Sequence, residues 1–166
     1  MAPQNVCTML RPLSLLLLVL SSLSPVRADN AWLDPNQDCV EGIVEVYGEI
    51  PFDGDTGDYY VDLCTNPLKL ITVYAAALTY CTADEIDAGF KLRGGYCSQY
   101  GLVEQVPMSE FAANLTPEAI KQMPIIEYTG EEPTENITAP AIISQEWYEL
   151  SFLTVVESPG NFTCSR

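Results

Sequence analysis

The longest regular pattern of apolar and polar residues lies between residues 66 and 97, where it predicts two consecutive helices. Asn66 is a suitable N-cap for the first helix, and Pro67 fits the first helical position because the N–H that it lacks is not needed there. From there to Cys81, apolar residues recur three or four positions apart. These residues are Leu68, Ile71, Ala75 and Leu78. The pattern therefore predicts a first helix with one apolar face.

Thr82 begins the second helix, because Glu85 follows three residues later and completes a capping box. The pair Gly94-Gly95 is typical of a helix end, so this helix is expected to stop before Cys97. Together the two segments predict a central helical hairpin with cysteines at its joints. The fold class expected is mainly α: a small helical domain built on this hairpin, stapled by disulfides and completed by irregular loops.

Weaker patterns surround the hairpin. Residues 40–50 alternate loosely between apolar and polar, which fits either an extended segment or a short helix. Glycines and aspartates predict a loop over residues 51–58, and a glycine, two prolines and several glutamates predict an exposed linker over residues 128–140. Ser144 is expected to cap a last helix. On that helix three residues would share one face, namely Trp147, Leu150 and Thr154.

The first 28 residues have the features of a secretory signal peptide. One basic residue precedes an apolar run over residues 13–20, and residues 26–28 end in the small residue of a cleavage site. The run is shorter than the roughly 20 residues that a membrane-spanning helix needs, which disfavours an uncleaved anchor. The expected organisation is a signal peptide over residues 1–28, a secreted cysteine-containing helical domain over residues 29–157 and a tail over residues 158–166.

The chain is strongly acidic, with a formal net charge of −16 and no histidine. All 23 acidic residues follow residue 28, whereas Arg11 and Arg27 lie in the expected signal peptide. Such a charge repels phosphate backbones and anionic lipids, which excludes nucleic acid as a partner and indicates a solvated surface. No second apolar segment of membrane-spanning length follows, so the expected location is extracellular.

The six cysteines are not all expected to form disulfides within the secreted domain. Cys7 leaves with the signal peptide, and Cys164 is left over. The other four are expected to form two disulfides in an oxidising compartment, with three connectivities open. These four are Cys39, Cys64, Cys81 and Cys97. A zinc site is a poor alternative, because the chain has no Cys-x-x-Cys pair and no histidine.

Three Asn-x-Thr sequons are expected to carry N-linked glycans. Their acceptor residues are Asn114, Asn136 and Asn161. Pro117 directly follows the first sequon and disfavours its use.

Asp53, Asp55 and Asp58 are weak candidates for metal ligands. With Asp62 they lie in a glycine-containing acidic stretch, and oxygen-rich loops bind calcium. In the register of an EF-hand loop, however, Gly57 occupies a ligand position, which favours a solvated acidic loop. No residue is expected to be catalytic. Without histidine the chain has no Ser-His-Asp or Cys-His arrangement, and nothing singles out a carboxylate pair for glycoside hydrolysis.

Several motifs follow one another in a recognisable order: Cys39, Cys64, Tyr80-Cys81, residues 85–89, Cys97, residues 140–144 and residues 146–148. This order resembles the extracellular N-terminal domain of fungal ferric reductase-like transmembrane proteins. The resemblance covers roughly residues 39–157, most of the expected secreted domain. The motifs include no catalytic signature.

The resemblance implies a small, helical, disulfide-linked and glycosylated ectodomain. In the family, this domain precedes a membrane bundle that binds haem through histidines and a cytosolic part that binds FAD and NADPH. Electrons then pass outward to extracellular ferric or cupric chelates. None of those parts is present in this sequence. The chain is therefore expected to be a secreted, non-catalytic ectodomain without a cofactor, connected with iron or copper uptake.

An extracellular protein or a metal chelate is the partner expected for such a domain. If the chain is a fragment of a full-length reductase, its location is the outer face of the plasma membrane. The tail over residues 158–166 with Cys164 indicates either a short paralogue or a truncated gene model. The alternative to the whole interpretation is an unrelated secreted fungal interaction protein stabilised by cysteines.

Overall fold

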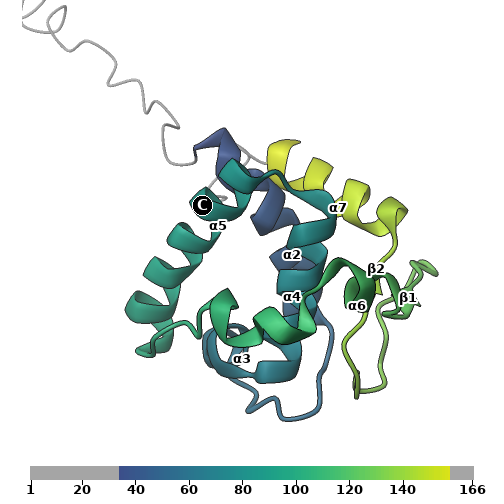
Figure 1. Ribbon diagram of the computed structural model, residues 1–166, viewed down its shortest axis with the longest axis horizontal. Coiled ribbons are helices and arrows are strands. Elements are labelled where there is room, and N and C mark those ends of the chain that lie inside the picture. Colours follow the sequence, from purple (N-terminus) through teal and green to yellow (C-terminus); the bar gives the residue numbers. More distant parts are fainter. Residues whose placement is uncertain (1–33, 158–166) are drawn as a thin grey trace, which may run out of the picture. The chain divides into compact units, whose positions relative to one another are not determined.

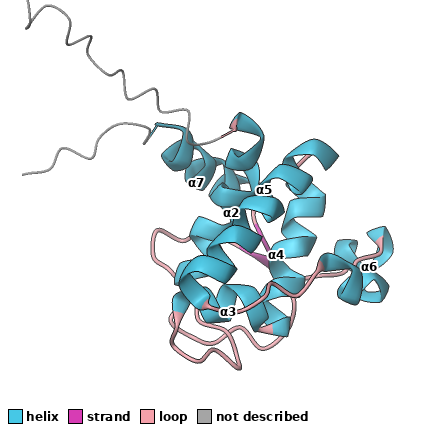
Figure 2. Cartoon of the chain, turned by 90° about the vertical axis from the view of Figure 1, so that its left-hand side faces the viewer, coloured by secondary structure: helices cyan, strands magenta, loops and turns pink. Residues whose placement is uncertain are grey.

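The computed structural model describes residues 34–157, and most of them lie in helices (Figure 1; Figure 2). The α-helices are α2 (Asp38–Glu49), α3 (Tyr59–Thr65), α4 (Pro67–Tyr80), α5 (Ala83–Tyr96), α6 (Pro117–Lys121) and α7 (Gln145–Glu157). Helices of other types are the 3-10 helices η1 (Pro35–Gln37) and η3 (Met108–Asn114) and the π-helix η2 (Cys97–Gly101). Strands β1 (Ile125–Ile126) and β2 (Ile142–Ile143) pair in parallel. The mainly helical class expected from the sequence is confirmed.

Helix α2 lies at the centre of the core, where it packs against α4, α5 and α7 (Figure 1). Its side chains at Val40 and Tyr47 are fully buried. Gly42 allows α7 to approach closely, because a Cβ atom there would lie 3.0 Å from the Cα atom of Phe152. The Ser151 hydroxyl donates a hydrogen bond of 2.7 Å to the Gly42 carbonyl. Of the two structures that fit the loose alternation in this segment, the helix is the one that forms.

The predicted helical hairpin is present as α4 and α5. The Asn66 side chain accepts a 2.9 Å hydrogen bond from the backbone N–H of Leu68, which caps α4. Thr82 and Glu85 form the expected capping box at the start of α5, with the Glu85 carboxylate 2.7 Å from the Thr82 nitrogen. Both helix starts follow from short-range hydrogen bonding, which is why the sequence alone predicts them.

Helix α5 ends before Cys97 as expected, but Gly94-Gly95 do not end it. Helix α5 continues to Tyr96, and the π-helix η2 follows directly. Glycine ends a helix by adopting a positive φ, and neither of these glycines has one; the positive φ is found at Leu102, where it is 54°. Two glycines inside a helix cost about 1 kcal/mol each relative to alanine, and the disulfide at Cys97 together with the packing of α5 outweighs that cost.

Two disulfides join the helices, and the structure selects one of the three possible connectivities. Cys39 at the start of α2 bonds to Cys81, directly after α4, with a Cα–Cα distance of 5.9 Å. Cys64 in α3 bonds to Cys97, directly after α5, with a Cα–Cα distance of 5.8 Å. Each bond therefore ties one end of the hairpin to a helix that precedes it.

Tyrosines near the first disulfide hold β2 and α7 in place. The Tyr80 hydroxyl donates a 2.6 Å hydrogen bond to the Ile143 carbonyl, and its ring stacks on Tyr148 with centroids 4.6 Å apart. The Tyr148 hydroxyl lies 3.1 Å from the Cys39 sulfur. The Tyr47 hydroxyl accepts a 2.8 Å hydrogen bond from the Ile143 N–H. These contacts fix the side of α2 along which α7 runs.

Helix α7 starts as predicted, since the Ser144 hydroxyl accepts a hydrogen bond from the Trp147 N–H. Trp147, Leu150 and Thr154 do share one face, because all three line the same pocket. That face is only partly buried, however, and Leu150 is 46% exposed. The buried residues of the helix are Trp147, Tyr148 and Ser151. The shared face thus borders a cavity at its inner edge and solvent at its outer edge.

Candidate functional site

The acidic loop that the sequence offered as a weak metal site is held by its own hydrogen bonds. The Asp55 carboxylate accepts from the Phe52 N–H at 2.9 Å and from the Asn66 amide at 2.9 Å. The Lys69 ammonium forms an ion pair with it at 3.0 Å, and the Lys69 side chain is buried. Asp58 caps α3 by accepting from the Tyr60 N–H at 3.1 Å.

The remaining aspartates of the loop are also engaged. Asp62 is buried and accepts from both the N–H and the hydroxyl of Thr56 at 2.7 Å. The Asp53 carboxylate accepts from the Asn136 amide at 3.3 Å. Within residues 34–157, no group of three or more His, Cys, Asp or Glu side chains is placed to hold a metal ion. The loop is therefore a structural element, in which carboxylates accept hydrogen bonds from backbone N–H groups that have no backbone acceptor.

Two of the three sequons can be located. Asn114 and Asn136 are both exposed. The hydroxyl of Thr116 in the first sequon accepts a hydrogen bond from the Ala119 N–H and caps α6. Asn161 lies outside the described residues, as do Cys7, Cys164, the expected signal peptide and the expected tail.

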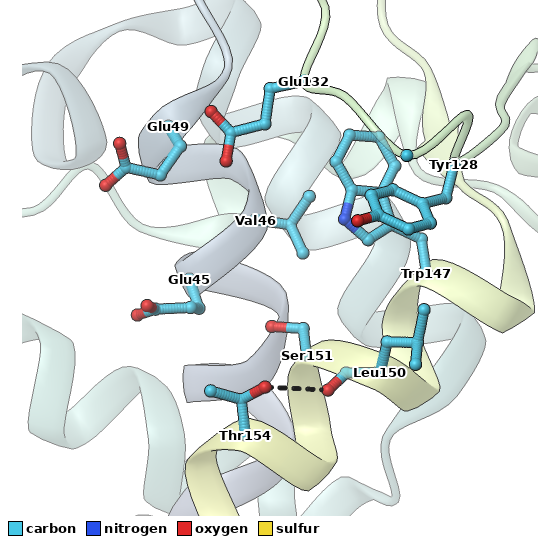
Figure 3. A pocket seen from close by; sticks show the side chains of 10 residues that line it. Glu45, Val46, Glu49, Tyr128, Glu132, Trp147, Leu150, Ser151 and Thr154 are labelled. Atoms are coloured by element: carbon cyan, nitrogen blue, oxygen red, sulfur yellow. Dashed lines mark hydrogen bonds between the residues drawn. The ribbon is translucent and has the colours of Figure 1, made fainter.

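The candidate functional site is a pocket of about 450 Å³ between α2, α7 and the segment that follows β1, called here the α2–α7 pocket (Figure 3). Its lining residues are Glu45, Val46, Glu49, Tyr128, Gly130, Glu132, Trp147, Leu150, Ser151 and Thr154. Its volume lies within the range of about 300 to 1,000 Å³ that is usual for small-molecule sites.

Each wall of the pocket follows from its helix geometry. Glu45 and Glu49 are four residues apart and so lie on one face of α2, with Val46 buried beside them. The rings of Tyr128 and Trp147 contact each other with centroids 5.4 Å apart. Figure 3 shows the two α2 carboxylates on one side, the two rings on the other and Glu132 between them.

The serine and threonine hydroxyl groups of the pocket already form hydrogen bonds. The Ser151 hydroxyl donates to the Gly42 carbonyl, and the Thr154 hydroxyl donates to the Leu150 carbonyl at 3.0 Å (Figure 3). The carboxylates are not used in this way. No hydrogen bond or ion pair formed by the described residues engages the side chains of three acids, which are Glu45, Glu49 and Glu132.

Among the residues that the structure describes, no positive charge in the lining balances the carboxylates of the pocket. None of its lining residues is basic. In the described part of the chain the two ion pairs lie elsewhere, between Lys69 and Asp55 and between Arg93 and Glu41, and both cations are buried. The α2–α7 pocket is therefore an anionic cavity with one aromatic wall.

A second pocket of about 620 Å³ lies between α5 and residues 104–108. It is lined by Phe90 and Met108 and carries both an acid, Asp87, and a base, Lys91. Opposite charges on neighbouring turns of one helix stabilise each other, so this pocket has less unbalanced charge than the α2–α7 pocket. We therefore take the α2–α7 pocket as the candidate site.

Sequence reasoning missed this site. Its residues come from three segments, around residues 45–49, 128–132 and 147–154, and only the packing of α7 on α2 brings them together. Residues 128–132 belong to the stretch predicted as an exposed linker, and they are exposed as expected. The one available signal in the sequence is a pair of glutamates four residues apart on a short helix. The repulsion between two such carboxylates is unfavourable unless solvent or a ligand offsets it.

The comparisons with known proteins find no relative of this chain. No family model, no curated protein and no solved structure matches the chain. Within residues 34–157, no helix combines the length and the apolar character that crossing a membrane requires.

Proposed function

We propose that this chain is an extracellular, non-catalytic ligand-binding domain and that the α2–α7 pocket is its binding site. The observation that carries the proposal is a cavity with an aromatic wall and carboxylates that have no partner among the described residues. A pocket with a few convergent polar groups on an apolar surface is the usual form of a small-ligand site.

Two features support an extracellular location. The disulfides Cys39–Cys81 and Cys64–Cys97 are of the kind that persist in oxidising compartments. The sequon acceptors Asn114 and Asn136 are exposed and accessible to a glycosylating enzyme. Binding rather than catalysis is supported by the lining of the pocket, which pairs no nucleophile with a base, and by a chain without histidine.

The indole N–H of Trp147 provides a direct test of the proposal. The chain has two tryptophans, so Trp32→Phe leaves Trp147 as the only indole signal in an NMR spectrum. Small molecules of matched size should be titrated in three classes: cationic, neutral and anionic. At least one class is expected to shift the Trp147 resonance until it saturates.

A matched pair of variants localises the binding. Thr154→Phe places a ring in the pocket and is expected to abolish the shift. Leu153→Phe changes the neighbouring residue of α7, which is 50% exposed and outside the lining, and should leave the shift intact. If no class of molecule shifts the resonance, or if both variants behave alike, the pocket is not a binding site.

We also propose, as the more specific identity, an ectodomain related to those of fungal ferric or cupric chelate reductases. This proposal is supported by the way the resembling motifs meet in space: Tyr80 contacts Tyr148, whose hydroxyl lies 3.1 Å from the sulfur of Cys39, which is bonded to Cys81. Haem, FAD and NADPH would belong to other parts of such a reductase.

Sequencing the transcript beyond codon 159 tests this identity. A reading frame that continues into apolar segments with histidines is expected for a reductase. A stop codon after Arg166 would instead leave a short paralogue or an unrelated secreted fungal interaction protein. Neither result changes the test of the pocket itself.

A further inference from the structure

We propose that the α2–α7 pocket binds an alkylammonium group, a cation carried on an apolar stem. This inference rests on the proposed function and adds the chemical class of the ligand. Two sources share the chemistry, a small free amine and the lysine side chain of a polypeptide, and the experiment below distinguishes them.

The charge of the pocket selects for a cation. Glu45, Glu49 and Glu132 line the cavity with exposed side chains, and no described residue pairs with any of them. Asp55 differs from them, because it has three partners of its own. A cavity with charge of one sign concentrates ligands of the opposite sign.

The positions of the basic residues in the domain also favour a cationic ligand. The part of the chain that the structure describes has four basic residues, which are Lys69, Lys91, Arg93 and Lys121. Lys69 and Arg93 are buried in ion pairs with other acids. The two exposed lysines do not line the pocket. Within residues 34–157, no basic side chain is therefore placed to neutralise these glutamates.

The opposite wall of the pocket requires an apolar part on the ligand. The Tyr128 and Trp147 rings lie side by side, and Leu150 continues this surface to the rim (Figure 3). Methylene chains that end in an ammonium group pack their stem on such surfaces and leave the charged head in a polar environment. An aromatic face within about 6 Å of an ammonium group also attracts it directly.

A bare metal ion fits the pocket less well. A divalent ion needs several oxygen ligands at bonding distance, and no group of three such side chains exists within residues 34–157. An alkylammonium ion is satisfied by longer-range attraction and a few hydrogen bonds. The volume of about 450 Å³ is also far larger than a metal ion requires.

The experiment is a titration of the Trp32→Phe protein followed by the Trp147 indole resonance. The probes are n-butylammonium chloride, its neutral isostere n-butanol and its anionic counterpart sodium butyrate, at pH 7 and low ionic strength. An alkylammonium group is fully charged at this pH. We expect n-butylammonium to bind at least about tenfold more tightly than either of the other two, and added salt to weaken it.

Two charge-matched variants test the role of the carboxylates. In the first, Glu45, Glu49 and Glu132 are all replaced by Gln, which should weaken n-butylammonium about tenfold. In the second, three exposed acids outside the pocket are replaced by Gln, and binding should be unchanged. These control residues are Glu110, Glu118 and Glu146.

The source of the ammonium group follows from a further comparison of probes. N-acetyl-lysine amide binding as tightly as n-butylammonium would assign the site to a polypeptide side chain, and binding of the free amine alone would assign it to a small molecule. Equal affinity for n-butanol and n-butylammonium, or equal losses in the two triple variants, would overturn the inference while leaving a ligand pocket. Failure of every probe would overturn the proposed function as well.

Discussion

The contact between α2 and α5 makes a sharp prediction at two glycines of the same helix. A Cβ atom at Gly89 would lie 2.4 Å from Cβ and 2.5 Å from Cγ2 of Val40, a side chain with 0% exposure. A Cβ atom at Gly95 would meet nothing within 4 Å. Both positions are helical, so replacement by alanine changes the same intrinsic helix propensity at each.

The magnitudes follow from these two environments. Gly95→Ala should stabilise the protein by about 0.5 to 1 kcal/mol, which is the difference in helix propensity between the two residues. Gly89→Ala gains the same amount but forces α5 away from Val40, and overpacking of this kind costs about 1 to 3 kcal/mol. Because the contact is much closer than van der Waals distance, the upper end of that range applies, and the net effect should be a loss of about 2 kcal/mol.

Urea unfolding followed by circular dichroism at 222 nm measures both effects under one set of conditions. The midpoint should rise for Gly95→Ala and fall for Gly89→Ala, with little change in the slope for either. If Gly89→Ala were as stable as Gly95→Ala, α5 would not pack on α2 as described, and the central position of α2 would be wrong.

Two further predictions concern the disulfides and the buried ion pair. Cys81→Ser should lower the melting temperature more than Cys164→Ser, because it opens the Cys39–Cys81 bond, whose loss from a small domain costs about 2 to 5 kcal/mol; equal shifts in a thermal scan would contradict this connectivity. Arg93→Met should destabilise the protein at pH 7, because Glu41 then keeps a half-buried charge with no cation near it. Burial raises the pKa of Glu41 above its usual 4.5, although Arg93 lowers it. A raised pKa means that the protonated carboxyl favours the folded state. This contribution to stability is complete below the usual value of 4.5 and is lost as pH rises through the raised pKa. The penalty of Arg93→Met should therefore shrink between pH 7 and pH 4 in urea unfolding, and a penalty that is the same at both pH values would contradict the burial of a charged Glu41.

Much of the fold was predictable because its signals are local. The N-caps at Asn66, Thr82 and Ser144 depend on hydrogen bonds within three residues, and all three helices start where expected. The hydrophobic pattern between them gave the hairpin. The mainly helical class therefore needed no tertiary information.

The errors arose where tertiary contacts decide the outcome. Gly94-Gly95 looks like a helix end, but the disulfide at Cys97 and the burial of Arg93 against α2 carry the helix past it. The choice among three disulfide connectivities likewise depends on which helices are neighbours. Local propensity is too weak to settle either question.

The candidate site was hidden for a related reason. The acidic loop drew attention because its aspartates are close in sequence, yet the structure uses Asp55 and Asp62 as hydrogen-bond acceptors for the loop itself. The α2–α7 pocket combines Glu45 and Glu49 of α2 with Glu132 and with Trp147 of α7, and these three segments are far apart in sequence. They share a cavity only because of tertiary packing, in which α7 lies on α2. Carboxylates that a fold leaves without partners are recognisable once the contacts are known.

The most direct measurement of the central claim is an intermolecular nuclear Overhauser experiment on the Trp32→Phe protein with saturating n-butylammonium. We expect contacts between the methylene protons of the ligand and the ring protons of Trp147 and Tyr128, and their loss in Thr154→Phe. Contacts to residues outside the α2–α7 pocket, or none at saturation, would contradict the claim that this pocket binds an ammonium group on an apolar stem.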